Sequence, residues 1–406
     1  RYEFVTGVQT CALPIYWRET GNEVLFEAPA VVLATGGIGK SFKITSNSWE
    51  GTGDGHALAL KAGSALVDME FVQFHPTGMV WPPSVRGILV TESVRGDGGV
   101  LTNSEGKRFM FNYIPEVFKD KYADNEEEAD RWYKDQNNNR RPPELLPRDE
   151  VARAINAEVK AGRGSEHGGV YLDVSKRLPA DEIKRRLPSM WHQFKELADV
   201  DITEQPMEVG PTCHYVMGGV KVDPDTTAAY GVEGLFAAGE VAGGMHGSNR
   251  LGGNSLSDLL VFGRRAGAGA ADYVKKLGGK TPEASDKAIA KAHDHLNAPF
   301  TREGNENPYS LHNELQNVTQ DLVGIIRTEK ELVDALKKLE SIRERAGKVK
   351  ATGGKAFNPG FHLAIDLENM LLVSESIARS ALDRQESRGG HTRDDYPKMD
   401  PNWRQV

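Results

Sequence analysis

The chain has 406 residues, of which 39% are hydrophobic and 27% are charged, so it is long enough for two or three domains with apolar cores. Its formal net charge of −8 argues against nucleic acid as a partner, and the lack of a run of about 18 apolar residues argues against a direct membrane span. Its two cysteines, Cys11 and Cys213, are too few for a disulfide framework or a zinc-type cluster, so we predict no metal site.

The amino-terminal peptide VTGVQTCALPI, residues 5–15, can be translated from a common sequencing-adaptor oligonucleotide. We therefore predict that residues 1–15 are an adaptor artefact, fused where the native N-terminal region was lost. Such a segment is left out of the fold prediction. An intact gene that encodes the same residues would refute this interpretation.

The next part of the chain has the pattern of a dinucleotide-binding sheet. Residues 23–26 and 30–33 predict the two strands of a hairpin, and the second strand runs into Ala34-Thr35-Gly36-Gly37. Glycines at the end of a strand let the backbone approach a ligand closely. The peptide GTGDG then precedes a predicted helix at 57–62. On spacing alone its Asp54 suits a helix cap as well as a cofactor contact.

The middle of the chain is predicted to alternate short strands with helices and one insertion. Residues 111–143 are rich in charge and Asn, which indicates an exposed insertion. A helix is predicted to open at Arg148, because Val151, Ile155 and Val159 recur at a spacing of four. Strands are expected at 71–74, 89–91 and 170–173, and residues 179–197 are expected to be largely helical.

Residues 234–268 predict a strand, an acidic residue, a Gly-rich loop and a helix that begins near Asn254. A helix N-terminus preceded by glycines can receive a phosphate, a carboxylate or the polar edge of a flavin. Arg250 lies in the loop, and its fork of donors suits a carboxylate. The segment therefore predicts an anion site beside a cofactor site, although taken alone it suits a plain strand-to-helix connection equally well.

Beyond residue 278 the pattern becomes helical again. Thr281-Pro282-Glu283 is typical of a helix start, and leucines recur at helical spacing later in the chain. These stripes predict a separate helical domain whose apolar residues serve packing.

Further segments resemble, in chain order, the flavoprotein subunit of succinate dehydrogenase and fumarate reductase. They are FVQFHPTG at 71–78, LVTESVRGDGG at 89–99, PRD at 147–149, GPTCHYVMGG at 210–219 and ESRGGHTRDDYP at 386–397. The resemblance covers nearly everything from about Val31 to the end. It implies an α/β chain with an incomplete FAD-binding Rossmann-like domain, an inserted α+β capping domain and a C-terminal helical domain. The implied bounds are 16–66 and 211–278 for the FAD-binding domain, 67–210 for the capping domain, 279–385 for the helical domain and 386–406 for a C-terminal segment.

The resemblance also implies roles for single residues. FAD would contact Gly36, Gly37, Asp54, Glu240, Asn254, Ser255 and Leu256. Succinate or fumarate, each a C4 dicarboxylate, would be held at one end by His75 and Thr91 and at the other by His214 and Arg250.

Arg148 is implied as the base that takes the substrate proton, with Glu92 and Arg95 carrying that proton to solvent. A free guanidinium has a pKa above about 12, which makes it a poor base in water. A dry site and a second cation, here Arg250, would each lower such a value. In the reverse direction Arg148 would act as the acid.

Some family features are absent between residues 1 and 31: the first GxGxxG fingerprint, the acid that follows it and the histidine segment for covalent flavin. We therefore expect the polypeptide as written to bind FAD poorly.

Two alternatives remain: L-aspartate oxidase, which shares the HPT, TE and RD elements, and a noncatalytic assembly subunit. The resemblance further implies two partners, a membrane anchor and an iron–sulfur subunit. It places the protein peripherally on the cytoplasmic face of a bacterial inner membrane, with residues 387–397 as the first region in which to look for partner contact.

Overall fold

The computed structural model describes residues 11–17, 19–280 and 283–404 and divides into two compact units. Unit 1 comprises Arg1–Lys43, Asn47–Val72 and Tyr215–Val406, and unit 2 comprises Ile44–Ser46 and Gln73–His214. Part of the predicted adaptor artefact, residues 1–10, and the predicted helix start at Thr281-Pro282 lie outside the described residues.

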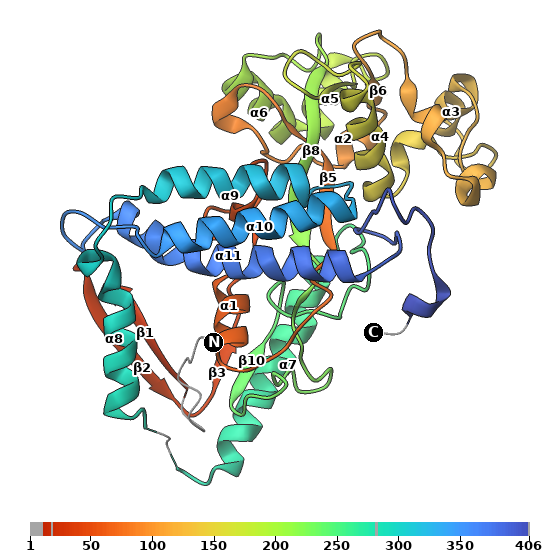
Figure 1. The fold of residues 1–406 in the computed structure, drawn as a ribbon. Coiled ribbons are helices and arrows are strands. Elements are labelled where there is room, and N and C mark those ends of the chain that lie inside the picture. The colour runs from red at the N-terminus through yellow and green to blue at the C-terminus, as the bar shows by residue number, and fades with distance from the viewer. Residues whose placement is uncertain (1–10, 18, 281–282, 405–406) are drawn as a thin grey trace. The chain divides into compact units, whose positions relative to one another are not determined.

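A pair of parallel strands lies in the part of unit 1 that is predicted to bind FAD. β3 (Val31–Leu33) pairs with β10 (Leu235–Ala237), so the expected strands at both places are confirmed. Helices α1 (Asp54–Lys61) and α7 (Asn254–Lys276) follow the glycine-rich turns, as predicted (Figure 1). A second pair, β4 (Leu66–Val67) and β9 (Gly219–Val220), runs antiparallel. The core here is made of Leu33, Ala59, Val220, Leu235, Ala237 and Val241.

The predicted hairpin between residues 23–26 and 30–33 is wrong. β2 (Asn22–Ala28) pairs with β1 (Cys11–Trp17) in an antiparallel register, whereas β3 takes β10 as its partner. The connection after β2 contains Pro29, and proline is locked at a negative φ, whereas tight hairpin loops favour residues with a positive φ. The turn between β1 and β2 instead contains Gly21 at a φ of 70°.

Four further helices make the helical part of unit 1, and the leucine spacing predicted two of them, at Glu329–Ala346 and Pro359–Asp383. They are α8 (Asp286–Thr301), α9 (Pro308–Leu322), α10 (Glu329–Ala346) and α11 (Pro359–Asp383). Helices α9, α10 and α11 lie side by side (Figure 1). Each of the four starts after a Ser, Asn or Thr whose side chain accepts a backbone N–H, which satisfies a donor that the first helical turn leaves unpaired.

Unit 2 is built on a four-stranded sheet in the order β5 (Val72–Met79), β8 (Met207–Val216), β7 (Val170–Asp173) and β6 (Val100–Thr102). Its helices are α2 (Ser93–Gly96), α3 (Glu126–Trp132), α4 (Arg148–Lys160), α5 (Ala180–Arg186) and α6 (Pro188–Ala198). The strand expected at 89–91 is wrong, since only one isolated bridge, between Gly78 and Leu89, forms before the chain turns into α2. Buried residues of the core include Leu101, Val151, Ile155, Leu172 and Val209.

Short 3₁₀ helices complete the described structure, at Gly39–Ser41, Pro83–Val85, Phe109–Tyr113, Glu116–Lys121, Pro143–Leu145 and Pro401–Arg404. No helix among the described residues is both long enough and apolar enough to cross a membrane.

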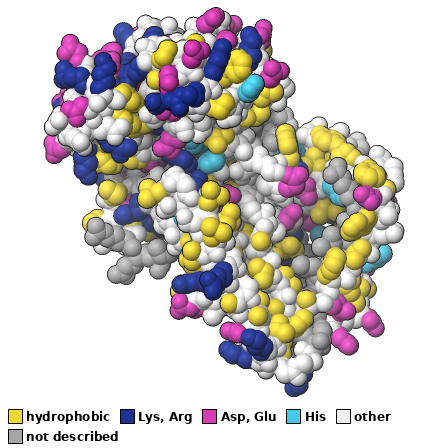
Figure 2. All heavy atoms as spheres, turned by 180° about the vertical axis from the view of Figure 1, so that it is seen from behind, with side chains coloured by type: hydrophobic (Ala, Val, Ile, Leu, Met, Phe, Trp, Pro, Cys, Tyr) yellow, Lys and Arg dark blue, Asp and Glu magenta, His cyan; other side chains and the backbone are white. Residues whose placement is uncertain are grey.

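Helix α7 has an exposed apolar face. The side chains of Leu256, Leu259 and Leu260 are 66%, 53% and 77% exposed. Figure 2 shows hydrophobic side chains over the lower half of the face that it presents, along which α7 runs in Figure 1. The first turn of α7 is therefore an open surface beside the glycine-rich loop.

Candidate active site

The glycine-rich turns of unit 1 leave room for a flat polar ligand. A Cβ built on Gly36, Gly244, Gly247 or Gly253 would meet nothing within 4 Å, so each of these glycines has open space beside its backbone. Gly36 and Gly253 also have positive φ values, 73° and 83°, which glycine adopts without strain. Such open space beside the backbone, next to a helix N-terminus, fits the phosphate and ring edges of a dinucleotide.

Glu240 is a partly buried acid directly beside Gly37. A Cβ on Gly37 would overlap the Glu240 carboxylate, so any other residue at position 37 would displace this carboxylate from its present place. Burial raises the pKa of Glu240 to about 7, although the N–H of Val216, 3.0 Å from Oε1, and the nearby Arg250 oppose that rise. A group so close to neutrality can accept hydrogen bonds from ligand hydroxyls or donate one.

Asp54 is the first residue of α1, and the residue that caps the helix is Gly53. The sequence left open whether Asp54 is a plain cap, and its position inside the helix removes that interpretation. Its Oδ1 accepts a hydrogen bond of 2.9 Å from Asn369 on α11. Asp54 therefore lies at a helix N-terminus in unit 1, held by the helical part of the same unit.

Arg250 is 4% exposed and lies over an aromatic platform. Its guanidinium is 4.4 Å from the centre of the Tyr215 ring, and its Nη1 donates to Ser255 Oγ at 3.3 Å. The Tyr215 hydroxyl lies 3.2 Å from His246 Nε2 and 3.5 Å from Asp258 Oδ2. Sequence reasoning missed Tyr215 and Asp258. Their positions could have indicated them: Tyr215 directly follows His214, and Asp258 lies one turn into α7.

His75 and His214 are neighbours in unit 2 because they lie on the adjacent strands β5 and β8. Their ring centres are 5.3 Å apart. Burial, followed by the nearby charges of Arg95, Arg148 and His214, lowers the pKa of His75 well below its usual 6.5. Its Nδ1 lies 3.0 Å from the carbonyl oxygen of Thr77. His75 is therefore a neutral, fixed ring at physiological pH.

Arg148, Glu92 and Arg95 form a cluster beside these histidines. Arg148 donates to Glu92 Oε2 from Nε at 2.9 Å and approaches it from Nη2 at 2.8 Å, while Arg95 Nη2 lies 4.0 Å from the same oxygen. Burial alone would raise the pKa of Glu92, but the charges of Arg95 and Arg148 outweigh burial and lower this pKa. Burial, aided by the charge of Arg148, lowers the pKa of Arg95 to about 10. The carboxylate thus joins two guanidinium groups, one of them easier to deprotonate than usual.

Gln73 also contacts this cluster, since its Oε1 accepts from Arg148 Nη1 at 3.4 Å. Sequence reasoning missed it, although residues two apart on a strand share a face and Gln73 is two residues before His75. Thr91 follows Val90, whose N–H donates to the carbonyl oxygen of Thr77 at 3.0 Å. The Thr91 hydroxyl lies 3.5 Å from Ser93 Oγ. Unit 2 therefore brings together the predicted residues His75, His214, Glu92, Arg95 and Arg148, whereas Arg250 belongs to unit 1.

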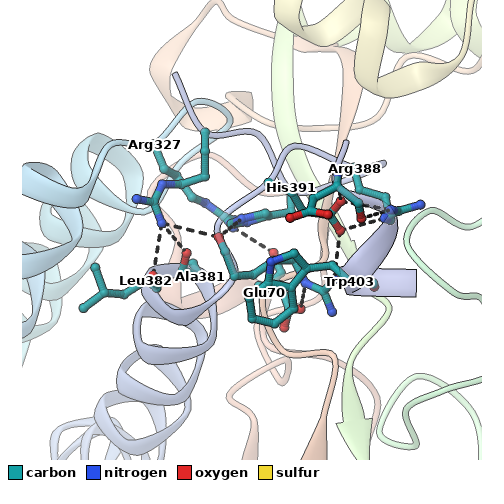
Figure 3. Close-up of polar contacts among 11 residues, drawn as sticks. Glu70, Arg327, Ala381, Leu382, Arg388, His391 and Trp403 are labelled. Atoms are coloured by element: carbon teal, nitrogen blue, oxygen red, sulfur yellow. Dashed lines mark hydrogen bonds and ion pairs between the residues drawn. The ribbon is translucent and has the colours of Figure 1, made fainter. Parts of the chain in front are cut away.

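Buried arginines hold the C-terminal segment of unit 1 in place (Figure 3), and one of them, Arg327, lies between α9 and α10. Arg327 Nη1 lies 2.9 Å from His391 Nδ1 and 2.8 Å from the carbonyl oxygen of Glu70. Because arginine only donates, Nδ1 of His391 accepts, and Nε2 donates to the carbonyl oxygen of Arg384 at 3.2 Å. Burial and the charge of Arg327 lower the pKa of His391 to about 2, so the ring stays neutral.

This segment also supports the loop that carries Arg250. The N–H of Gly390 donates to the carbonyl oxygen of Ser248 at 2.8 Å, and Gly389 has a φ of 53°. A Cβ on Gly389 would overlap the backbone of Ser248. The sequence singled out residues 387–397 as a region for partner contact, but Ser387, His391 and Arg393 make internal hydrogen bonds.

Comparisons with known proteins agree with this architecture. An FAD binding domain model matches residues 4–256, and a model of the fumarate reductase flavoprotein C-terminal region matches residues 312–406. One subunit of the fumarate reductase (CoM/CoB) of Methanothermobacter marburgensis is 43% identical over 383 residues, which are 94% of this chain and 63% of that protein.

Two solved structures are similar as well. Mycobacterium smegmatis Sdh1 in complex with UQ1 matches with a TM-score of 0.81 and 67% identity, over 97% of this chain and 61% of that one. The quinol fumarate reductase of E. coli matches with a TM-score of 0.84 and 34% identity, over 96% of this chain and 64% of that one.

The chain thus spans somewhat over three fifths of the length of the relatives it matches. The family model covers more than half of the chain, and the α/β fold class inferred from the sequence is confirmed. The chain belongs to the FAD-binding flavoprotein subunits of the succinate dehydrogenase and fumarate reductase family.

Proposed function

We propose that the protein interconverts succinate and fumarate and passes the electrons from FAD through an iron–sulfur subunit to quinone. The observation that carries this proposal is the Glu92 carboxylate that joins Arg148 and Arg95 beside the paired rings of His75 and His214. A dicarboxylate needs donors for both ends and a proton acceptor at its centre, and unit 2 offers a histidine for each end together with Arg148, whereas the remaining donor, Arg250, belongs to unit 1. The named relatives favour this activity over L-aspartate oxidation or a noncatalytic role.

His75 and Thr91 would bind one carboxylate, and His214 and Arg250 would bind the other. His75 is neutral and Arg250 is charged, so the second end would be held more by charge and the first by hydrogen bonds. Fixing both ends orients the two central carbons before any bond is broken.

Arg148 would take the proton from one central carbon during succinate oxidation and return it during fumarate reduction. FAD, when bound, supplies the hydride acceptor that no side chain can provide. The residues that would hold it are Gly36, Gly37, Asp54, Glu240, Asn254, Ser255 and Leu256; the open space at Gly36 and the close approach of Glu240 to Gly37 support this. Glu92 accepts hydrogen bonds from Arg148, and its side chain is 46% exposed, so the proton would leave through this carboxylate with Arg95 beside it.

The partners we propose are a membrane anchor and an iron–sulfur subunit, which would place the protein peripherally at the cytoplasmic face of a bacterial inner membrane. The relatives' names support a complex that works with a quinone. The contact region remains the exposed part of residues 387–397, which includes Asp394 and Pro397.

The proposal predicts that the complete gene product, purified with FAD, is bleached by succinate under anaerobic conditions. Loss of the flavin absorbance near 450 nm reports hydride transfer without any partner subunit. L-Aspartate at the same concentration should leave the spectrum unchanged. Bleaching by aspartate and not by succinate would establish the oxidase instead, and bleaching by neither would overturn the proposed chemistry.

Gly37→Ala should lower flavin content at least about tenfold, because the added methyl group displaces the Glu240 carboxylate from its place beside the backbone. The ratio of absorbance at 450 nm to that at 280 nm measures this loss. Gly354→Ala is the matched control, since a Cβ there meets nothing within 4 Å. Equal flavin content in both variants would remove Gly37 from the cofactor site.

A further inference from the structure

Residues 44–46 form a short edge on strand β8 next to His214. Thr45 and Cys213 make a parallel bridge, and the N–H of Cys213 donates to the carbonyl oxygen of Ile44 at 2.9 Å. These residues and β8 up to His214 all belong to unit 2. The bridge places the Ser46 hydroxyl 2.8 Å from Nδ1 of His214.

The hydrogen bonds around Cys213 decide which way the Ser46 hydroxyl points. The carbonyl oxygen of Cys213 accepts from the N–H of Ser46 at 3.0 Å and from Thr45 Oγ1 at 2.9 Å. A carbonyl oxygen has two lone pairs, so these two donors occupy it. Ser46 Oγ lies 3.4 Å from that oxygen but only 2.8 Å from Nδ1. The hydroxyl proton therefore goes to the ring.

A ring whose Nδ1 accepts a hydrogen bond carries its proton on Nε2 when it is neutral. We propose that Ser46 is a positioning residue, which fixes the orientation and the tautomer of His214 so that its Nε2–H donates to a substrate carboxylate. This rests on the proposed function, in which His214 binds one end of a dicarboxylate. Ser46 itself touches neither substrate nor cofactor in this scheme.

The consequence is that His214 can donate a hydrogen bond from Nε2–H while its ring is neutral. The ring centre of His75, a titratable group, lies 5.3 Å from that of His214, and Arg95 and Arg148 act on His75. Burial keeps His75 neutral across the physiological range, so its charge does not change where histidine normally titrates. Without the Ser46 hydroxyl, Nδ1 of His214 would lose this hydrogen bond, and with it the preference that the bond gives to the tautomer protonated on Nε2.

Ser46→Ala in the complete gene product should raise KM for succinate about three- to tenfold, the usual effect of one lost hydrogen bond, with kcat changed less than about twofold. The ratio of the variant's KM to that of the wild type should be largest where His214 is neutral and should shrink once the His214 ring becomes protonated, which its nitrogen shifts report. Imidazolium donates from Nε2 in both proteins at low pH, whereas only the wild type keeps the donor fixed at high pH. Ser46→Thr, which keeps the hydroxyl, should restore KM, and Ser48→Ala is the control, because the Ser48 hydroxyl bonds to Glu50.

A second readout needs no turnover. In protein labelled with ¹⁵N-histidine, with His214→Gln used for assignment, the His214 nitrogens should show a protonated Nε2 and an unprotonated Nδ1. Ser46→Ala should shift both toward averaged values. An unchanged KM, a pH-independent ratio or an unchanged tautomer in Ser46→Ala would overturn the role of Ser46. Absence of succinate-dependent flavin bleaching in the wild type would instead overturn the proposed function, and the nitrogen shifts would still test Ser46.

Discussion

Arg148→Lys should abolish succinate oxidation, with a loss of at least about a thousandfold in kcat, while the flavin spectrum stays unchanged. Arg148 uses two nitrogens on Glu92 and a third on Gln73, and this fork fixes the guanidinium in place. A lysine has one compact charged group and cannot reproduce that geometry. Dye-coupled succinate oxidation measures the effect, and absorbance at 450 nm confirms that FAD remains bound.

Arg153→Lys is the matched control for this experiment. Arg153 lies on the same helix, α4, and pairs with Asp149 and Glu150, so it reports what the substitution does to the helix alone. Its activity should stay within about twofold of the wild type. Turnover by Arg148→Lys above a tenth of the wild-type rate would remove Arg148 from proton transfer.

The glycine-rich turns and the helices after them could be predicted from sequence because their signals are local. Gly53 and Gly253 take positive φ just before α1 and α7, and that requirement is visible in the glycines themselves. The same holds for α4, whose apolar residues repeat at helical spacing and are buried at Val151 and Ile155. Strand pairing was harder, because β3 takes as its partner a strand about two hundred residues away.

The candidate site shows the same division. His75, Arg148 and His214 stand in recognisable motifs, so their types and order could be predicted. The contacts of the surrounding residues were harder to predict: Gln73 and Tyr215 had only the weak signal of their position beside the histidines, and the contact between Ser46 and His214 exists only in the folded chain. The buried arginines after α11 show this most clearly. In the sequence ESRGGHTRDD suggests an exposed charged segment, yet His391 and Glu386 have no exposed surface.

Glu386→Gln should lower the free energy of unfolding by about 3–5 kcal/mol at pH 7, since removing one partner of a buried ion pair leaves the other charge uncompensated. Glu386 accepts from Arg388 Nε at 2.7 Å and Nη2 at 2.9 Å, and from Arg384 Nη1 at 3.0 Å. The N–H of Asp400 adds a further bond at 2.8 Å. Urea unfolding followed by circular dichroism measures the loss. Glu340→Gln is the control, because its pair with Arg343 on α10 is exposed and should change stability by about 1 kcal/mol or less.

The pH dependence gives this prediction a sign. Burial alone would raise the pKa of Glu386, but Arg388, the Asp400 N–H and Arg384 together lower it. The Glu386 carboxylate therefore binds a proton less readily in the folded protein than in the unfolded chain. The carboxylate therefore contributes stability above its ordinary pKa of 4.5, and that contribution is lost as pH falls through the lowered value. The stability difference between wild type and Glu386→Gln should be full at pH 7 and should shrink below about pH 4. A difference below 1 kcal/mol at pH 7, or one that stays constant on acidification, would mean that the arginines find other partners and that Glu386 is not what holds the C-terminal segment.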